Sequence, residues 1–161
     1  MEKRVFDKLD YVLHMPAEFS NKEKYPLVIY LHGAGGRGRD TDVIYNHPFF
    51  TKTEPWLKGA ISVAPQCYDD SWFSIFEQLQ AFVKNVMAWD CVDKSRVYVV
   101  GASMGGYATW GGCGHTWRQR LVFERSPIWP PCHPLTLLFT CVLAFQARGV
   151  ITQQGGGKSQ S

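Results

Sequence analysis

The stretch RVYVVGASMGGYATW, residues 96–110, decides the fold of this chain. Its first part, residues 96–100, is short, apolar and β-branched, which is typical of a strand buried in a sheet. The pattern G-x-S-x-G follows, with Ser103 between Gly101 and Gly105, and runs into a sequence that suits a helix from Met104 onward. A strand, a sharp turn and a helix are the setting of a nucleophile elbow. We therefore expect Ser103 to be a catalytic nucleophile; the plain alternative is an ordinary glycine-rich turn.

A second glycine-rich turn, HGAGG at residues 32–36, also follows an apolar run that predicts a buried strand, residues 27–31. Glycines allow backbone N–H groups to point toward one spot, so we expect Gly33, Ala34 and Met104 to supply an oxyanion hole. The supporting residues are His32, Gly35, Gly36, Gly101 and Gly105, with His32 bracing its loop. A phosphate-binding loop is the rival interpretation, but the G-K-[ST] ending and the G-x-G-x-x-G spacing are both missing.

Periodicity predicts the other elements of the first part of the chain. Residues 9–15 and 60–64 are expected strands. Over residues 71–89, apolar side chains recur along one face of a helix, and Ser74 with Glu77 fits a capping box at its start. Strands that alternate with helices predict an α/β fold, here a mainly parallel sheet with flanking helices.

The composition argues against two kinds of binding partner. The net charge is +3, with 45% hydrophobic and 19% charged residues, so we expect a globular chain that binds neither nucleic acid nor membrane. The N-terminus lacks the uninterrupted apolar segment of a secretory signal, and no run reaches the roughly 20 apolar residues of a membrane span. Five cysteines without a C-x-x-C pair suggest reduced thiols. A cytoplasmic location is the expectation; the oligomeric state is open.

The character of the sequence changes after Trp110. Residues 1–110 hold 12 Lys and Arg against 13 Asp and Glu, whereas residues 111–161 hold 5 against 1. The second part also loses the clear periodicity of the first and ends in a Gly- and Ser-rich tail. We expect residues 1–110 to be the N-terminal part of a hydrolase-type domain and residues 111–161 to be an aberrant, frameshifted or diverged segment, with C-terminal strands missing or aberrant.

Three blocks together resemble a known family. They are PLVIYLHGAGGRG (residues 26–38), VAPQC (residues 63–67) and RVYVVGASMGGYATW (residues 96–110). In this order they are similar to α/β-hydrolase esterases, the group of feruloyl esterases, polyhydroxybutyrate depolymerases and dienelactone hydrolase-like predicted peptidases. The resemblance covers about residues 9–110. It implies a serine-dependent carboxylic ester hydrolase that forms an acyl-enzyme, acts on a small-molecule ester and needs no metal or organic cofactor.

The same resemblance implies an acid and then a histidine downstream of the serine. After Ser103 the only acidic residue is Glu124, and the only histidines are His115 and His133. None follows a predicted strand, so these three are weak candidates for the acid and base. Their spacing with the nearby cysteines fits no common zinc site, and no metal is expected. The alternatives are a serine peptidase of the same fold and a non-catalytic pseudoenzyme or binding module.

Overall fold

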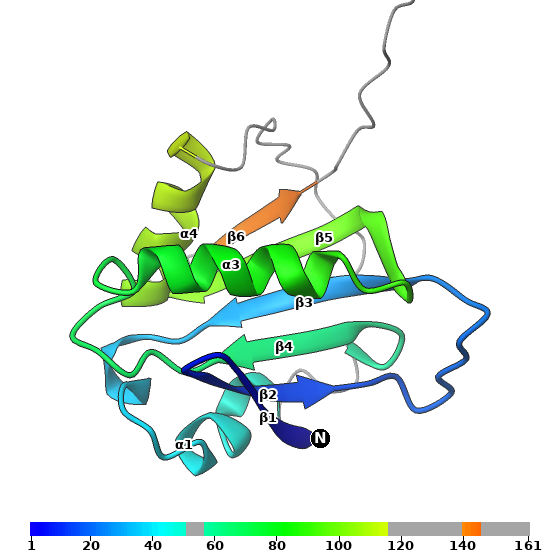
Figure 1. Cartoon of the computed structure of the whole chain (residues 1–161), viewed down its shortest axis with the longest axis horizontal. Helices are drawn as coiled ribbons and strands as arrows, with labels where there is room; N and C mark the ends of the chain where they lie inside the picture. Colours follow the sequence, from blue (N-terminus) through cyan, green and yellow to red (C-terminus); the bar gives the residue numbers. More distant parts are fainter. Residues whose placement is uncertain (51–56, 116–139, 146–161) are drawn as a thin grey trace, which may run out of the picture.

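The computed structural model describes residues 1–50, 57–115 and 140–145, and these form a sheet with helices beside it (Figure 1). The six strands lie in the order β1-β2-β4-β3-β5-β6. In chain order the elements are β1 (Glu2–Phe6), β2 (Leu9–His14), β3 (Tyr25–Leu31), a 3-10 turn (Ala34–Gly36), α1 (Asp42–Tyr45), β4 (Ile61–Pro65), α3 (Phe76–Met87), β5 (Val92–Ala102), α4 (Met104–His115) and β6 (Thr140–Phe145).

The sheet is mixed, and the expectation of a mainly parallel sheet was wrong. Strand β3 pairs in parallel with β4 and β5, but the pairs β1–β2, β2–β4 and β5–β6 are antiparallel. Strand β1 was not predicted, because its side chains are largely exposed and give no apolar period. It forms a hairpin with β2 through Asp7, whose φ is 54°, and a connection this short allows only antiparallel pairing.

Strand alternation divides the core between the two faces of the sheet. On β3, Leu27 and Ile29 face the larger cluster, which also holds the buried residues of α3. Val28 and Tyr30 face the opposite cluster, where the Tyr30 ring stacks on Phe49 with centroids 4.1 Å apart. Successive side chains of a strand point to opposite faces, so a run that is apolar throughout belongs in a strand covered on both sides.

Helix α3 confirms the predicted helix, in a shorter form, and overturns its predicted cap. The helix begins at Phe76 with Ile75 as the N-cap residue, and no side chain caps it. Ser74 lies in the preceding turn instead, where its N–H donates to the carbonyl of Ser71 at 3.2 Å. This local turn moves Ser74 one residue too early to cap the helix, so the capping box with Glu77 does not form.

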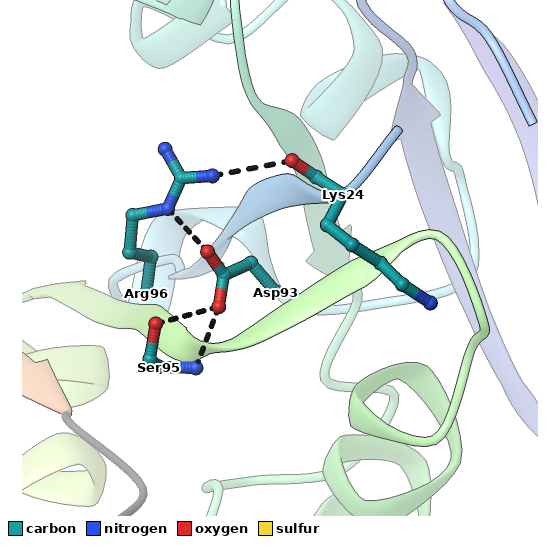
Figure 2. Close-up of polar contacts among 4 residues, drawn as sticks. All are labelled: Lys24, Asp93, Ser95 and Arg96. Carbon is teal, nitrogen blue, oxygen red and sulfur yellow. Dashed lines mark hydrogen bonds and ion pairs between the residues drawn. The ribbon is translucent and has the colours of Figure 1, made fainter. Parts of the chain in front are cut away.

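The amino ends of β3 and β5 are tied together by polar contacts (Figure 2). Arg96 donates from Nε to Asp93 Oδ2 at 2.6 Å and from Nη2 to the carbonyl of Lys24 at 3.1 Å. Ser95 donates from both its N–H and its hydroxyl to Asp93. The bonds from Ser95 and Arg96 lower the pKa of Asp93 to about 2, so its carboxylate stays charged and holds the Arg96 side chain that reaches the carbonyl of Lys24.

Strand β6 was not expected. It lies antiparallel along β5, with Val99 opposite Leu143, and its sequence TCVLAF is apolar enough for a sheet strand. The interpretation of residues 111–161 as aberrant stays a prediction, because most of them lie outside the described ranges. Over the residues that the structure describes, the helices are too short or too polar to cross a bilayer.

Candidate active site

Ser103 occupies the turn between a strand and a helix. Strand β5 ends at Ala102 and α4 begins at Met104, so the serine lies at the carboxyl end of β5. Its φ is 51°, a left-handed conformation that costs a non-glycine residue about 1–2 kcal/mol. The residue is exposed, and its carbonyl accepts a bond from the N–H of Tyr107 at 3.1 Å. This is the geometry of an elbow that presents a serine hydroxyl.

Two glycines let three chain segments meet at this turn. A Cβ on Gly105 would strike the carbonyl of Leu31 and approach the carbonyl of His32 to 2.8 Å. A Cβ on Gly101 would strike the backbone of Gly105 and come within 2.5 Å of Thr109 Oγ1. The first turn of α4 therefore rests directly on the end of β3, which no larger residue would permit.

The HGAGG turn lies beside Ser103. A Cβ built on Gly33 would be 3.5 Å from Ser103 Cβ and 3.3 Å from the carbonyl oxygen of Ala102. The turn is closed by two bonds: Gly36 N–H donates to the carbonyl of Gly33 at 3.0 Å, and Arg37 N–H donates to that of Ala34 at 3.3 Å. Closing the turn does not use the N–H of Ala34. The structure thus brings the two sequence motifs together at one place.

His32 braces this turn from beneath and is only 1% exposed. Its Nδ1 lies 2.6 Å from the carbonyl of Gly33, and its Nε2 lies 2.9 Å from the N–H of Cys67. An N–H donor at Nε2 and a carbonyl at Nδ1 require the neutral ring with its proton on Nδ1. Burial lowers the pKa of His32 to about 4, which keeps that form at neutral pH. With both nitrogens occupied, His32 is placed to hold the loop and not to accept a proton from Ser103.

Two side chains from the loop after β4 also bind the HGAGG turn. Trp72 Nε1 donates to the carbonyl of His32 at 3.0 Å, and the two rings lie 4.9 Å apart. Gln66 Nε2 donates to the carbonyls of Gly36 and Asp40, each at 3.0 Å. The sequence named Gln66 only within the VAPQC block, and Trp72 gave no motif signal. Bonds from side chains to backbone carbonyls leave no period or spacing to read.

Of the three candidates for the acid and base, only His115 lies in the described part of the chain, and it is not beside Ser103. Glu124 and His133 lie outside the described residues. His115 is the last residue of α4, three turns beyond the serine. At 1.5 Å per residue its backbone lies roughly 16 Å along the helix axis from Met104. Within the described residues, the structure therefore places Ser103 beside the backbone of the Gly33 turn.

The comparisons with known proteins point to esterases. A scan against protein-family models found no match, and a search of curated proteins found none either. Among solved structures, a thermostable esterase is 27% identical with a TM-score of 0.50 and covers 67% of this chain. Est1E from Butyrivibrio proteoclasticus is 24% identical with a TM-score of 0.53 and covers 70%. The butyrate-bound Est2 esterase of Thermogutta terrifontis is 17% identical with a TM-score of 0.51 and also covers 70%.

The chain spans only part of each of these proteins: 34% of the thermostable esterase, 44% of Est1E and 43% of Est2. The likeness to Est1E and Est2 is one of fold alone, at these identities. What the chain shares with all three is the part of an esterase fold described above, a mixed sheet with helices beside it.

Proposed function

We propose that this chain is the nucleophile and oxyanion part of a serine-dependent carboxylic ester hydrolase of the α/β-hydrolase type. The observation that carries the proposal is the packing of the Gly33 turn against Ser103, with the serine in a left-handed turn. A nucleophile and backbone donors within the span of one ester group are what acyl transfer requires. The likeness to esterase structures supports the same reaction class.

In the proposed reaction, Ser103 Oγ attacks the carbonyl carbon of the ester while its proton passes to a base. The carbonyl oxygen becomes an oxyanion, which the N–H groups of Ala34 and Met104 stabilise, with Gly33 as the third candidate donor. The alcohol then leaves with a proton, and the acyl group stays on Ser103. Water attacks this acyl-enzyme and releases the acid. Each backbone donor of this kind is worth about 10²–10³ in rate.

A complete triad also needs an acid and a base, and no credible pair is placed beside Ser103 in the described part of the chain. We therefore propose that the hydrolase is incomplete in this chain. A serine peptidase of the same fold is the alternative within hydrolases, because the site as described does not distinguish an amide carbonyl from an ester. A pseudoenzyme or binding module that retains the serine without a triad is the alternative outside them.

A fluorophosphonate probe tests the proposal directly. In large excess over many hours, we expect the probe to phosphonylate Ser103 slowly with release of hydrogen fluoride, because the oxyanion hole gives residual activation without a base. Mass spectrometry would detect the added phosphonyl group. Ser103→Ala should remove the labelling. Ser74→Ala is the matched control, since Ser74 is also exposed but lies in an ordinary turn. No labelling of the wild-type chain, or equal labelling of the Ser103→Ala chain, would favour the non-catalytic alternative.

A further inference from the structure

Arg37 is exposed, yet its side chain binds two backbone carbonyls. Nε donates to the carbonyl of Ala34 at 3.0 Å, and Nη1 donates to the carbonyl of Asp70 at 2.9 Å. An exposed arginine is ordinarily free to move in solvent, and fixing it costs side-chain entropy. Its two contacts join the turn beside Ser103 to the loop after β4.

The first step of the argument is the peptide group between Gly33 and Ala34. Its carbonyl is held by two donors, His32 Nδ1 at 2.6 Å and the N–H of Gly36 at 3.0 Å. In a trans peptide the N–H points opposite to the C=O of the same plane. Holding the carbonyl of Gly33 therefore sets the direction of the N–H of Ala34, which we have proposed as an oxyanion donor.

The second step is the next peptide group, between Ala34 and Gly35. Its carbonyl is also held twice, by the N–H of Arg37 at 3.3 Å and by Arg37 Nε at 3.0 Å. If this peptide plane rotates, Gly36 moves with it, and the N–H of Gly36 can no longer donate to the carbonyl of Gly33. Gly35 adds little restraint of its own, because glycine has a wide range of backbone conformations and nothing lies within 4 Å of the position that a Cβ would take. The Arg37 side chain thus adds a restraint to the carbonyl of Ala34, next to the most permissive residue of the turn.

From these contacts we propose that Arg37 is a positioning residue of the Ser103 site, acting through the carbonyl of Ala34 to direct the Ala34 N–H. The inference deepens the proposed function and rests on it. The arm to Asp70 gives the guanidinium a fixed anchor on the neighbouring loop. Arginine reaches the two carbonyls with two different nitrogens of a rigid planar fork. The single ammonium of lysine keeps the charge but does not reproduce this two-nitrogen geometry, so we expect the forked shape to matter more than the charge.

The test compares Arg37→Lys with Arg39→Lys in the full chain. Arg39 is the matched control: it is exposed and two residues away, but it lies 4.6 Å over the Tyr68 ring instead of on a carbonyl. The first readout is hydrolysis of a nitrophenyl ester and of its thiono analogue, each corrected by the Ser103→Ala chain. Sulfur accepts hydrogen bonds weakly, so the ester-to-thionoester rate ratio reports on the oxyanion donors and not on general stability. The second readout is the amide NMR shift of Ala34.

In Arg37→Lys we expect the ester-to-thionoester rate ratio to fall about tenfold, which is less than complete loss of a donor would cause. The KM should be nearly unchanged, and the NMR shift of the Ala34 amide should change. Arg39→Lys should change none of these. An unchanged ratio or an unmoved Ala34 amide in Arg37→Lys would overturn the inference. If the wild-type and Ser103→Ala chains hydrolyse the ester equally, the proposed function fails, and the proposed role of Arg37 in catalysis fails with it. A shifted Ala34 amide would then show that the fault lies in the proposed function and not in the contact.

Discussion

At the scale of single residues, the candidate site contains one residue with an unusual backbone conformation and one with an unusual pKa. Ser103 is in a left-handed conformation, and such strain persists only where the surrounding structure imposes it. Here the backbone of β3 packs against Gly105 and fixes the turn. His32 is a buried histidine kept neutral, and its uncharged ring is what allows it to accept the N–H of Cys67. Both states have measurable consequences.

The buried ring of His32 should make stability depend on pH. Its pKa is about 4 in the folded chain against an ordinary value of 6.5, so the unfolded chain binds the proton first as pH falls. The free energy of unfolding is then fully present above about pH 6.5 and declines as pH falls toward 4. Between pH 7 and pH 5 we expect a loss of about 2 kcal/mol from this group, measured by urea unfolding.

A variant separates His32 from other groups. Burial also lowers the pKa of His47, which therefore contributes with the same sign. His47→Gln should retain most of the decline, while His32→Gln should flatten it and lower stability at pH 7. If His32→Gln declines as steeply as the wild-type chain, His32 is not the neutral buried group described here.

The sequence could identify Ser103 and the HGAGG turn because a strand and a tight glycine turn leave a readable local pattern. It could not identify Arg37, Gln66 or Trp72 as parts of the same site. Their partners are backbone carbonyls about 3 to 40 positions away in the chain, and any residue type supplies a carbonyl. Such contacts exist only once the loops after β3 and β4 are folded side by side.

At the scale of elements, apolar runs predicted β2, β3, β4 and β5 to within a few residues, because burial on one or both faces dictates their composition. Strand β1 escaped notice since its residues face solvent and it depends on pairing with β2. The antiparallel direction of the outer strands also escaped, because strand composition alone does not reveal the direction of a partner.

The meeting of β3, β5 and α4 predicts a sharp contrast between two glycines. Gly105→Ala would drive a methyl group into the carbonyls of Leu31 and His32, and backbone cannot move aside cheaply. We expect a loss of about 3 kcal/mol or more in the free energy of unfolding, although alanine favours a helix by up to about 1 kcal/mol. Gly35→Ala meets nothing within 4 Å and should change stability by less than about 0.5 kcal/mol.

Chemical unfolding of the two variants beside the wild-type chain measures this contrast. Equal stability of Gly105→Ala and Gly35→Ala would mean that α4 does not rest on β3 as described, and the elbow geometry would then be wrong. The test needs no enzymatic activity, so it examines the elbow independently of the proposed function.

At the scale of the whole molecule, the described fold brings together the residues that we propose as the nucleophile and oxyanion part of a catalytic arrangement. The loops after β3, β4 and β5 converge at one end of the sheet, where Ser103 and the Gly33 turn meet (Figure 1). The chain covers less than half of each esterase structure named above. Beyond Ser103 it offers only Glu124, His115 and His133 as acid or base. If none of these three serves Ser103, the proposed nucleophile and oxyanion donors lack a base, and the rate of ester hydrolysis should be low.

We therefore predict that the 161-residue chain hydrolyses short-chain nitrophenyl esters poorly. General-base assistance is worth about 10²–10⁴ in rate, and triad members act as a unit. Replacing the chain after Trp110 by a continuation like that of the resembled family, with an Asp and a His on later loops, should raise turnover by orders of magnitude. Ser103→Ala in that chimera should abolish the gain. Rapid, Ser103-dependent turnover by the unmodified chain would contradict this prediction, and His133→Ala and His115→Ala would then show which histidine acts as the base.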